Sequence, residues 1–94
     1  ARGELDTALD YLQQSLAISQ QIGDKSGECV TLFNLGHIHW AKDETEQALM
    51  RWCRAYQLAK ASQFAQGLQA LEEMAEQLEL PGDWETRCSG VSRG

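Results

Sequence analysis

The chain has 94 residues and 43% hydrophobic content, which is enough for one small domain with a modest core but not for two. Its formal net charge of -6 argues against a nucleic-acid groove, because phosphate binding needs a clustered face of Lys and Arg. The apolar stretches are far shorter than the roughly 18 to 20 residues that span a bilayer and no basic-then-apolar leader opens the chain, so we expect no membrane segment.

The composition favours helices over the whole chain up to its single proline, Pro81. Ala, Leu, Gln and Glu are abundant, and all four are strong helix formers. The first residue is Ala1 rather than Met, and a helical pattern begins almost at once at Gly3. We therefore predict an all-α fold, and we expect the sequence to be a fragment that begins inside a longer protein.

Apolar residues recur with the helical period in four segments, at about 4–22, 26–41, 44–61 and 64–79. Gly23 and Asp24 supply a helix stop and a capping carboxylate after the first segment. The residues between the second and third segments, Asp43 with Glu46 three positions later, predict a capping box.

The boundary between the third and fourth segments is less defined, because it contains neither glycine nor proline, and Ser62 is the candidate cap there. Pro81 ends the last helix, since proline cannot continue it. We predict a helical repeat unit over residues 1–80 and a flexible C-terminal tail over 81–94.

The chain repeats itself when residues 3–27 are laid over residues 43–67, an offset of 40. Small residues then meet small ones and bulky residues meet bulky ones; for example, Leu12 falls on Trp52. A second match, at an offset of 39, places Leu35 on Met74. The four helices therefore alternate between two types.

The stretch Leu32-x2-Leu35-Gly36-x2-His39, followed by Ala48-x3-Trp52-x2-Ala55, resembles the tetratricopeptide signature of two antiparallel helices, A and B, per repeat. Gly36 and Ala48 stand where the two helices approach closely. His39 departs from the usual Tyr, and Lys60 stands near the usual proline. The 40-residue period looks like the longer variety found in kinesin light chains and in related spindle-orientation and bacterial regulatory scaffolds.

The resemblance implies a short right-handed solenoid of four stacked helices in the order B, A, B, A, covering roughly residues 3–80. A helices of such proteins line a concave groove that holds extended or helical peptides, and B helices form the outer wall. An asparagine just before the Leu-Gly pair, here Asn34, often hydrogen-bonds the backbone of the ligand in this family. Carried over by position, the groove-facing residues would be Val30, Phe33, Asn34, His37, Trp40 and Ala41.

Phe33 and Trp40 have a plainer interpretation, which is packing on neighbouring helices. In the last helix the groove positions map by the offset of 39 onto an acidic stripe, and no Lys or Arg lies between Ala61 and Thr86. A basic peptide would find a complementary surface there, although an ordinary solvated helix face is an equal alternative. The stripe consists of Glu72, Glu73, Glu76 and Glu79.

The three cysteines, Cys29, Cys53 and Cys88, are odd in number and widely spaced, which predicts no pairing framework and favours the reducing cytoplasm. We expect Cys29 and Cys53 in the core and Cys88 to be the most reactive. The histidines and cysteines lack the close spacing of a metal site, and we expect neither metal nor cofactor. No phosphate loop, zinc-protease run or nucleophile elbow occurs, so we do not expect an enzyme.

Two functions are consistent with this sequence. The first is a protein–protein interaction scaffold whose A helices hold a polypeptide partner in their groove. The alternative is an assembly segment that forms a homo-oligomer, because a lone B helix at the start and a lone A helix at the end each leave an apolar face uncovered.

Overall fold

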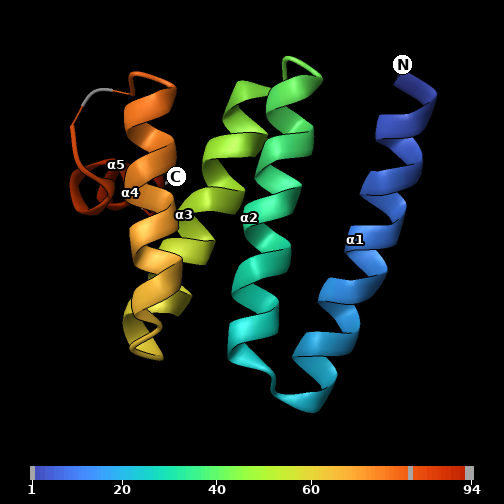
Figure 1. The fold of residues 1–94 in the computed structure, drawn as a ribbon, viewed down its shortest axis with the longest axis horizontal. Helices are drawn as coiled ribbons and strands as arrows, with labels where there is room; N and C mark the ends of the chain where they lie inside the picture. The colour runs from blue at the N-terminus through green and yellow to red at the C-terminus, as the bar shows by residue number, and fades with distance from the viewer. Residues whose placement is uncertain (1, 81, 93–94) are drawn as a thin grey trace.

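The computed structural model describes residues 2–80 and 82–92, and these fold into helices without any strand (Figure 1). The first four predicted helices are confirmed in number and order, with bounds that differ by at most two residues. Together with a fifth, they are α1 (Arg2–Ile22), α2 (Lys25–Ala41), α3 (Thr45–Ala61), α4 (Ala65–Gln77) and α5 (Trp84–Ser92).

The core lies where α2 packs on α3. Leu32, Leu35 and Trp52 are buried there with the small residues of α3, which confirms the predicted central contact. A Cβ atom at Gly36 would collide with the indole of Trp52, so only glycine lets the two helices approach this closely. The indole Nε1 donates a hydrogen bond to the backbone oxygen of Phe33 at 3.0 Å, and the buried polar group is thereby satisfied.

The turns between α1, α2, α3 and α4 share one geometry. Gly23, Asp43 and Gln63 each adopt a positive φ, of 74°, 62° and 57°, and the next residue donates its amide to a carbonyl five residues back. This turn is a common way for a helix to end: one residue in the left-handed conformation reverses the chain, and the following amide donates to a carbonyl that has no partner within the helix. Of these three left-handed positions only the first is a glycine, Gly23. The turn between α3 and α4 has Gln63 there, which explains why no glycine marked that turn in the sequence.

The capping predictions are confirmed at one boundary and wrong at two. Asp24 accepts a hydrogen bond from the Gly27 amide at 2.9 Å, as expected of a cap for α2. Asp43 lies in the left-handed turn, and Glu44, the residue directly before α3, makes no side-chain cap. Ser62 ends α3 instead of starting α4, because its hydroxyl donates to the Leu58 oxygen at 2.7 Å.

The C-terminal segment corrects the prediction of a flexible tail over 81–94. Residues 84–92 form α5, which packs on α3 at the end of the molecule beside α4 (Figure 1). Trp84 is buried and its Nε1 donates to the Leu71 oxygen at 3.0 Å, while Asp83 accepts from the Thr86 amide at 2.8 Å as a helix cap. The predicted tail residues Pro81, Arg93 and Gly94 lie outside the described residues.

Cys88 of α5 and Cys53 of α3 are joined by a disulfide, with their Cα atoms 5.3 Å apart. The prediction that the cysteines have no pairing partner was therefore wrong, and Cys88 is buried. The cytoplasmic location was inferred from that missing pairing, so its premise no longer holds. Cys29 is a free, buried cysteine, in line with the core position expected for it. In the described part of the chain, no helix is long and apolar enough to cross a membrane.

Candidate functional site

An open apolar hollow of about 270 Å³ lies between α2 and α4, on the face where the resemblance places the groove. It contains two of the predicted site residues, Val30 and Phe33, and Val30 is 48% exposed at its rim. Little of the surface that lines the hollow is polar. Its walls are Cys29, Val30 and Phe33 from α2 and Phe64, Gln66, Gly67 and Ala70 from the start of α4.

The hollow exists because small residues and one aromatic ring alternate at the start of α4. Gly67 faces Cys29, so a Cβ there would lie 3.2 Å from the Cys29 sulfur and closer still to the Phe64 ring. The Cys29 thiol donates to the Ala55 oxygen at 3.3 Å. Burial, with a smaller contribution from Glu28, raises the pKa of this thiol above its ordinary value, so it remains neutral and unreactive at the floor.

Asn34 and His37 line a different hollow, between α1 and α2, of about 570 Å³. Its walls are also largely apolar, and α1 supplies most of them. The His37 ring stacks edge-on against Phe33 and Trp52, with centroids 4.6 and 5.4 Å apart. This partial burial lowers the pKa of His37 below its ordinary 6.5. The lining residues are Glu4, Thr7, Ala8, Tyr11, Leu12, Asn34, His37 and Ile38.

Trp40 is half-buried, and its ring lies 5.6 Å from that of Trp52. This is the helix-packing arrangement that the sequence left open for Trp40. Phe33 packs against the core as well, yet it also forms a wall of the α2–α4 hollow. Both rings are partly exposed, and Phe33 is the one that lines the α2–α4 hollow.

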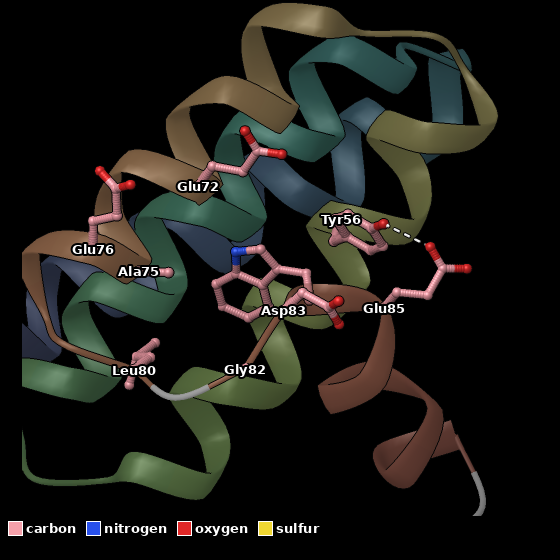
Figure 2. A pocket seen from close by; sticks show the side chains of 9 residues that line it. Tyr56, Glu72, Ala75, Glu76, Leu80, Gly82, Asp83 and Glu85 are labelled. Carbon is pink, nitrogen blue, oxygen red and sulfur yellow. Dashed lines mark hydrogen bonds between the residues drawn. The ribbon is translucent and has the colours of Figure 1, made fainter.

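The four predicted acidic residues are all exposed but do not gather at one place. Glu72 and Glu76 line a third hollow, of about 410 Å³, between α4 and the start of α5 (Figure 2). Glu73 accepts a hydrogen bond from Gln69 at 3.2 Å, one turn back on α4. Glu79 occupies the left-handed position of the turn after α4, with a φ of 55°.

The third hollow is acidic on both walls, but part of its charge is already paired. Glu85 accepts a hydrogen bond from Tyr56 at 3.2 Å (Figure 2). It also forms an ion pair with Lys60 at 2.8 Å. The Lys60 ammonium lowers the pKa of Glu85 below its ordinary value. Trp84 contributes to the lining from α5. Among the described residues, no His, Cys, Asp and Glu side chains group as metal ligands.

The sequence repeat explains why these positions differ in chemistry between α2 and α4. Phe33 of α2 maps onto Glu72 of α4 by the offset of 39. Phe33 faces the next A-type helix, α4, whereas Glu72 faces the end of the stack, where α5 begins. The apolar residue is partly buried at the first position, and the charged one is exposed at the second.

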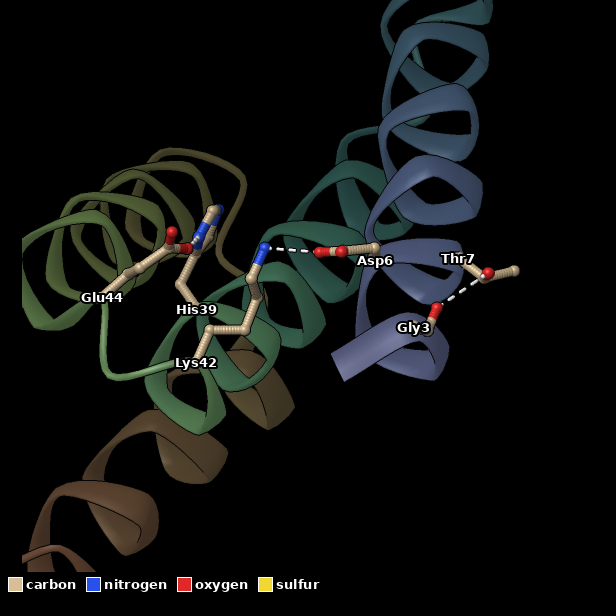
Figure 3. Close-up of polar contacts among 6 residues, drawn as sticks. All are labelled: Gly3, Asp6, Thr7, His39, Lys42 and Glu44. Atoms are coloured by element: carbon tan, nitrogen blue, oxygen red, sulfur yellow. Dashed lines mark hydrogen bonds and ion pairs between the residues drawn. The ribbon is translucent and has the colours of Figure 1, made fainter. Parts of the chain in front are cut away.

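Polar contacts connect the C-terminal end of α2 to α1 and to the residue directly before α3 (Figure 3). Lys42, at the end of α2, donates to the Asp6 carboxylate of α1 at 2.6 Å. His39 contacts Glu44, the residue before α3, at 2.8 Å between Nδ1 and Oε1. This His–Glu contact joins α2 to the residue directly before α3.

Sequence reasoning missed half of the α2–α4 hollow, namely the α4 side with Phe64, Gly67 and Ala70. An aromatic residue directly before a helix that carries small residues three and six positions later was the available signal. The sequence predicted an uncovered apolar face on the first helix without naming its residues, and on α1 the exposed apolar side chains are Tyr11, Ile18 and Ile22, at helical spacing.

A family model described as the tetratricopeptide repeat matches residues 1–61, which is about two thirds of the 94 residues. The matched part contains α1, α2 and α3. Neither the curated proteins nor the solved structures include a match to this chain.

Proposed function

The chain belongs to the tetratricopeptide repeat family, and from that premise we propose that it is a binding module that holds a segment of another polypeptide along the face shared by α2 and α4. Domains of this family generally mediate protein–protein interactions and are typically non-catalytic. The observation that carries the proposal is the open apolar hollow with Val30 exposed at its rim.

The hollow fits one apolar side chain of the ligand. Complete burial of a Leu, Ile or Met side chain contributes about 1.5 to 3 kcal/mol, which is enough to anchor a short peptide when polar contacts fix its direction. Asn34 and His37 follow Val30 at i+4 and i+7 and share its side of α2. The exposed Asn34 amide offers both a donor and an acceptor to the backbone of a peptide that continues along α2.

The ligand should carry Lys or Arg beside its apolar anchor. Glu73 lies one turn beyond Ala70 of the hollow, and Glu76 follows it on α4. No Lys or Arg occurs between Ala61 and Thr86, so nothing in that stretch of sequence neutralises these carboxylates. Attraction between them and a basic flank would speed association and would weaken as salt rises.

A random-peptide phage library selected on the immobilised protein tests the proposal, followed by fluorescence anisotropy on the enriched peptides. We expect a Leu, Ile or Met with Lys or Arg beside it. Val30→Asp should weaken binding of these peptides at least tenfold and Asn34→Ala several-fold. Met50→Asp is the matched control, because Met50 is exposed to a similar degree but lies on α3, and it should leave binding unchanged.

The proposal fails if the enriched peptides bind Val30→Asp as well as the wild type. It also fails if they are acidic, or if they lose affinity equally in the Met50→Asp control. Circular dichroism on each variant shows whether a loss of binding reflects a loss of fold.

A further inference from the structure

An open hollow of about 420 Å³ lies between α1 and α3, and it shares no lining residue with the α2–α4 hollow. We call it the α1–α3 hollow. Its α3 wall carries Gln47, Arg51 and Arg54, which stand at i, i+4 and i+7 and therefore share one side of the helix. Two cations thus lie together in a chain whose formal net charge is -6.

The two arginines have no acidic partner in the described part of the chain. Arg51 is half-buried and Arg54 is exposed, and neither guanidinium group forms an ion pair or a hydrogen bond with a described residue. By contrast, Lys42 and Lys60 each form an ion pair with a carboxylate. No Asp or Glu stands three or four positions from either arginine along α3. Neighbouring like charges on a helix repel, and an anion between them would remove that repulsion.

His39 supplies a buried polar atom to the same hollow. Its ring is part of the lining, and its side chain is only 10% exposed. Nδ1 contacts the Glu44 carboxylate at 2.8 Å, and because a carboxylate only accepts, Nδ1 donates (Figure 3). Nε2, on the far side of the ring from Glu44, has no hydrogen-bond partner among the described residues. A buried polar atom left in this way costs free energy, which favours a ligand that bonds to it.

The internal repeat shows that packing alone does not require these polar residues. By the offset of 40, Arg51 and Arg54 fall on a tyrosine and a glutamine of α1. By the offset of 39, His39 falls on Leu78. The same positions of the other repeat therefore carry uncharged side chains, and the helix pairs form without a cation or an imidazole there.

The carboxylates beside the hollow are already engaged by residues of its lining. Glu28 accepts a hydrogen bond from Gln20 at 3.4 Å, and Glu44 accepts from His39. Nε2 of His39 is covered in the free protein, so contact with it requires exposed rim side chains such as Met50 to change rotamer. The groups that remain to meet a ligand are two guanidinium groups and this nitrogen, which together favour an anion.

A phosphoryl group matches these donors better than a carboxylate does. It has three terminal oxygens and a charge of about -1.5 to -2 near pH 7, so one group can bridge Arg51 and Arg54 and neutralise both. A carboxylate carries a single charge. Because the second pKa of a phosphoryl group is about 6, it can also share a hydrogen with Nε2 of His39, as donor or as acceptor. An ionised carboxylate can only accept.

We propose that the α1–α3 hollow is a binding site for a phosphomonoester, in which Arg51 and Arg54 hold the phosphoryl oxygens and His39 shares a hydrogen with one of them. The hollow is larger than a phosphoryl group, so the first atoms of the esterified group also enter it and contact Leu16 and Met50. The ester has two possible sources, a free small molecule and a phosphorylated side chain of a polypeptide. This site does not depend on the proposed α2–α4 groove.

NMR titration of the ¹⁵N-labelled protein tests the site, with inorganic phosphate, sulfate and acetate as probes at pH 7 and constant ionic strength. The side-chain Nε–H signals of arginine report contact with the anion directly. We expect phosphate to shift these signals of Arg51 and Arg54 and to bind at least tenfold more tightly than acetate. Sulfate should bind several-fold more weakly than phosphate, because it has the same shape but no hydrogen to share with His39.

Arg51→Gln and Arg54→Gln should each weaken phosphate binding at least tenfold. Lys25→Gln is the matched control, because it removes the same charge from an exposed residue that does not line the hollow, and it should leave affinity unchanged. Neither arginine belongs to the buried core, so both variants should fold, as circular dichroism will show.

His39→Leu, which introduces the residue found at the matching position Leu78, should abolish the preference for phosphate over sulfate. Val30→Asp should change neither affinity, which separates this site from the groove on α2 and α4. If His39→Leu does not fold, the arginine variants and the comparison of phosphate with sulfate on the wild type still decide the proposal.

Two further probes distinguish the sources of the ester. Glycerol 3-phosphate represents a small molecule, and a library of peptides with one phosphoserine between random flanks represents a polypeptide. Selection of particular flanks that bind at least tenfold more tightly than glycerol 3-phosphate identifies a phosphorylated polypeptide as the ligand. Peptides that bind no better than glycerol 3-phosphate identify a small molecule.

Three results would overturn the proposal. The first is that phosphate leaves the Nε–H signals of Arg51 and Arg54 unshifted. The second is an equal loss of affinity in Lys25→Gln, because binding would then follow the total charge of the molecule. The third is equal affinity for phosphate, sulfate and acetate, which would describe a general anion-attracting surface with no preference for phosphomonoesters.

Discussion

Gly36 lies directly against the indole of Trp52, and the closeness of α2 and α3 depends on this pair. Gly36→Leu should lower the free energy of unfolding by at least about 1 to 3 kcal/mol, because the added side chain overpacks the contact. Gly3→Ala is the matched control, since a Cβ there meets nothing within 4 Å. It should be neutral or should stabilise by up to about 1 kcal/mol, as alanine favours a helix over glycine. Urea denaturation followed by circular dichroism measures both.

His37 should make stability depend on pH, because contact with Phe33 and Trp52 lowers its pKa below the ordinary 6.5. Between the lowered pKa and 6.5 the unfolded chain binds more protons than the folded one, so the free energy of unfolding rises with pH. The stability that neutral His37 contributes to the folded state is fully present above pH 6.5 and is lost as the pH falls below that value. His37→Gln should flatten this part of the curve, measured by urea denaturation from pH 5 to 8. Equal slopes for both proteins would contradict the placement of this ring.

At the scale of single elements, α5 is held by Trp84 and by the disulfide to α3. Cys88→Ser should lower the free energy of unfolding by about 4 kcal/mol, the chain-entropy estimate for a crosslink between residues 35 apart. Trp84 should move into water, with a red shift of fluorescence. Reductant should have the same effect on the wild type and none on Cys88→Ser. Cys29→Ala keeps the disulfide and should still respond to reductant.

The first four helices could be predicted because their apolar residues repeat every three to four positions over thirteen or more residues. The caps at Asp43 and Ser62 could not, because Asp43 and Gln63 adopt the left-handed turn that sequence reasoning assigns to glycine. The helix α5 has only nine residues, and its stability comes from burial of Trp84 and a bond to a distant cysteine. Neither contact has a local sequence signal.

The candidate site was predictable on α2 and much less so on α4. Val30 and Phe33 face α4, as their carried-over positions require, because both helices of that contact are present in the chain. Position alone did not locate Glu72 and Glu76, since α4 has α5 rather than another A-type helix beyond it. Their roles as ligand contacts stay a prediction, as do those of Asn34, His37, Trp40, Glu73 and Glu79. The kinesin light chain-like variety of the repeat likewise stays a prediction.

The whole molecule has two unlike ends. The C-terminal end is covered by α5 and faced with carboxylates, whereas α1 at the other end packs on α2 and leaves Tyr11, Ile18 and Ile22 in water. In a stack stabilised by neighbouring contacts, the helix with fewest of them opens first. Backbone amides of α1 between Leu5 and Leu12 should therefore exchange with deuterium faster than those of α3 between Ala48 and Ala55. Equal protection of α1 and α3 would mean that the fold opens as one unit.

The crosslink between Cys53 and Cys88 also decides how the molecule carries mechanical load. A force applied to the two chain ends passes from α3 directly to α5 through the sulfur atoms, so the 34 intervening residues, which include all of α4, bear no tension. In a single-molecule pulling experiment the fully stretched chain should be shorter by about 120 Å than in the presence of reductant, at roughly 3.5 Å per residue. The α4 side of the groove, from Phe64 to Ala70, thus lies within a covalently shielded loop, while α1 and α2 take the full strain.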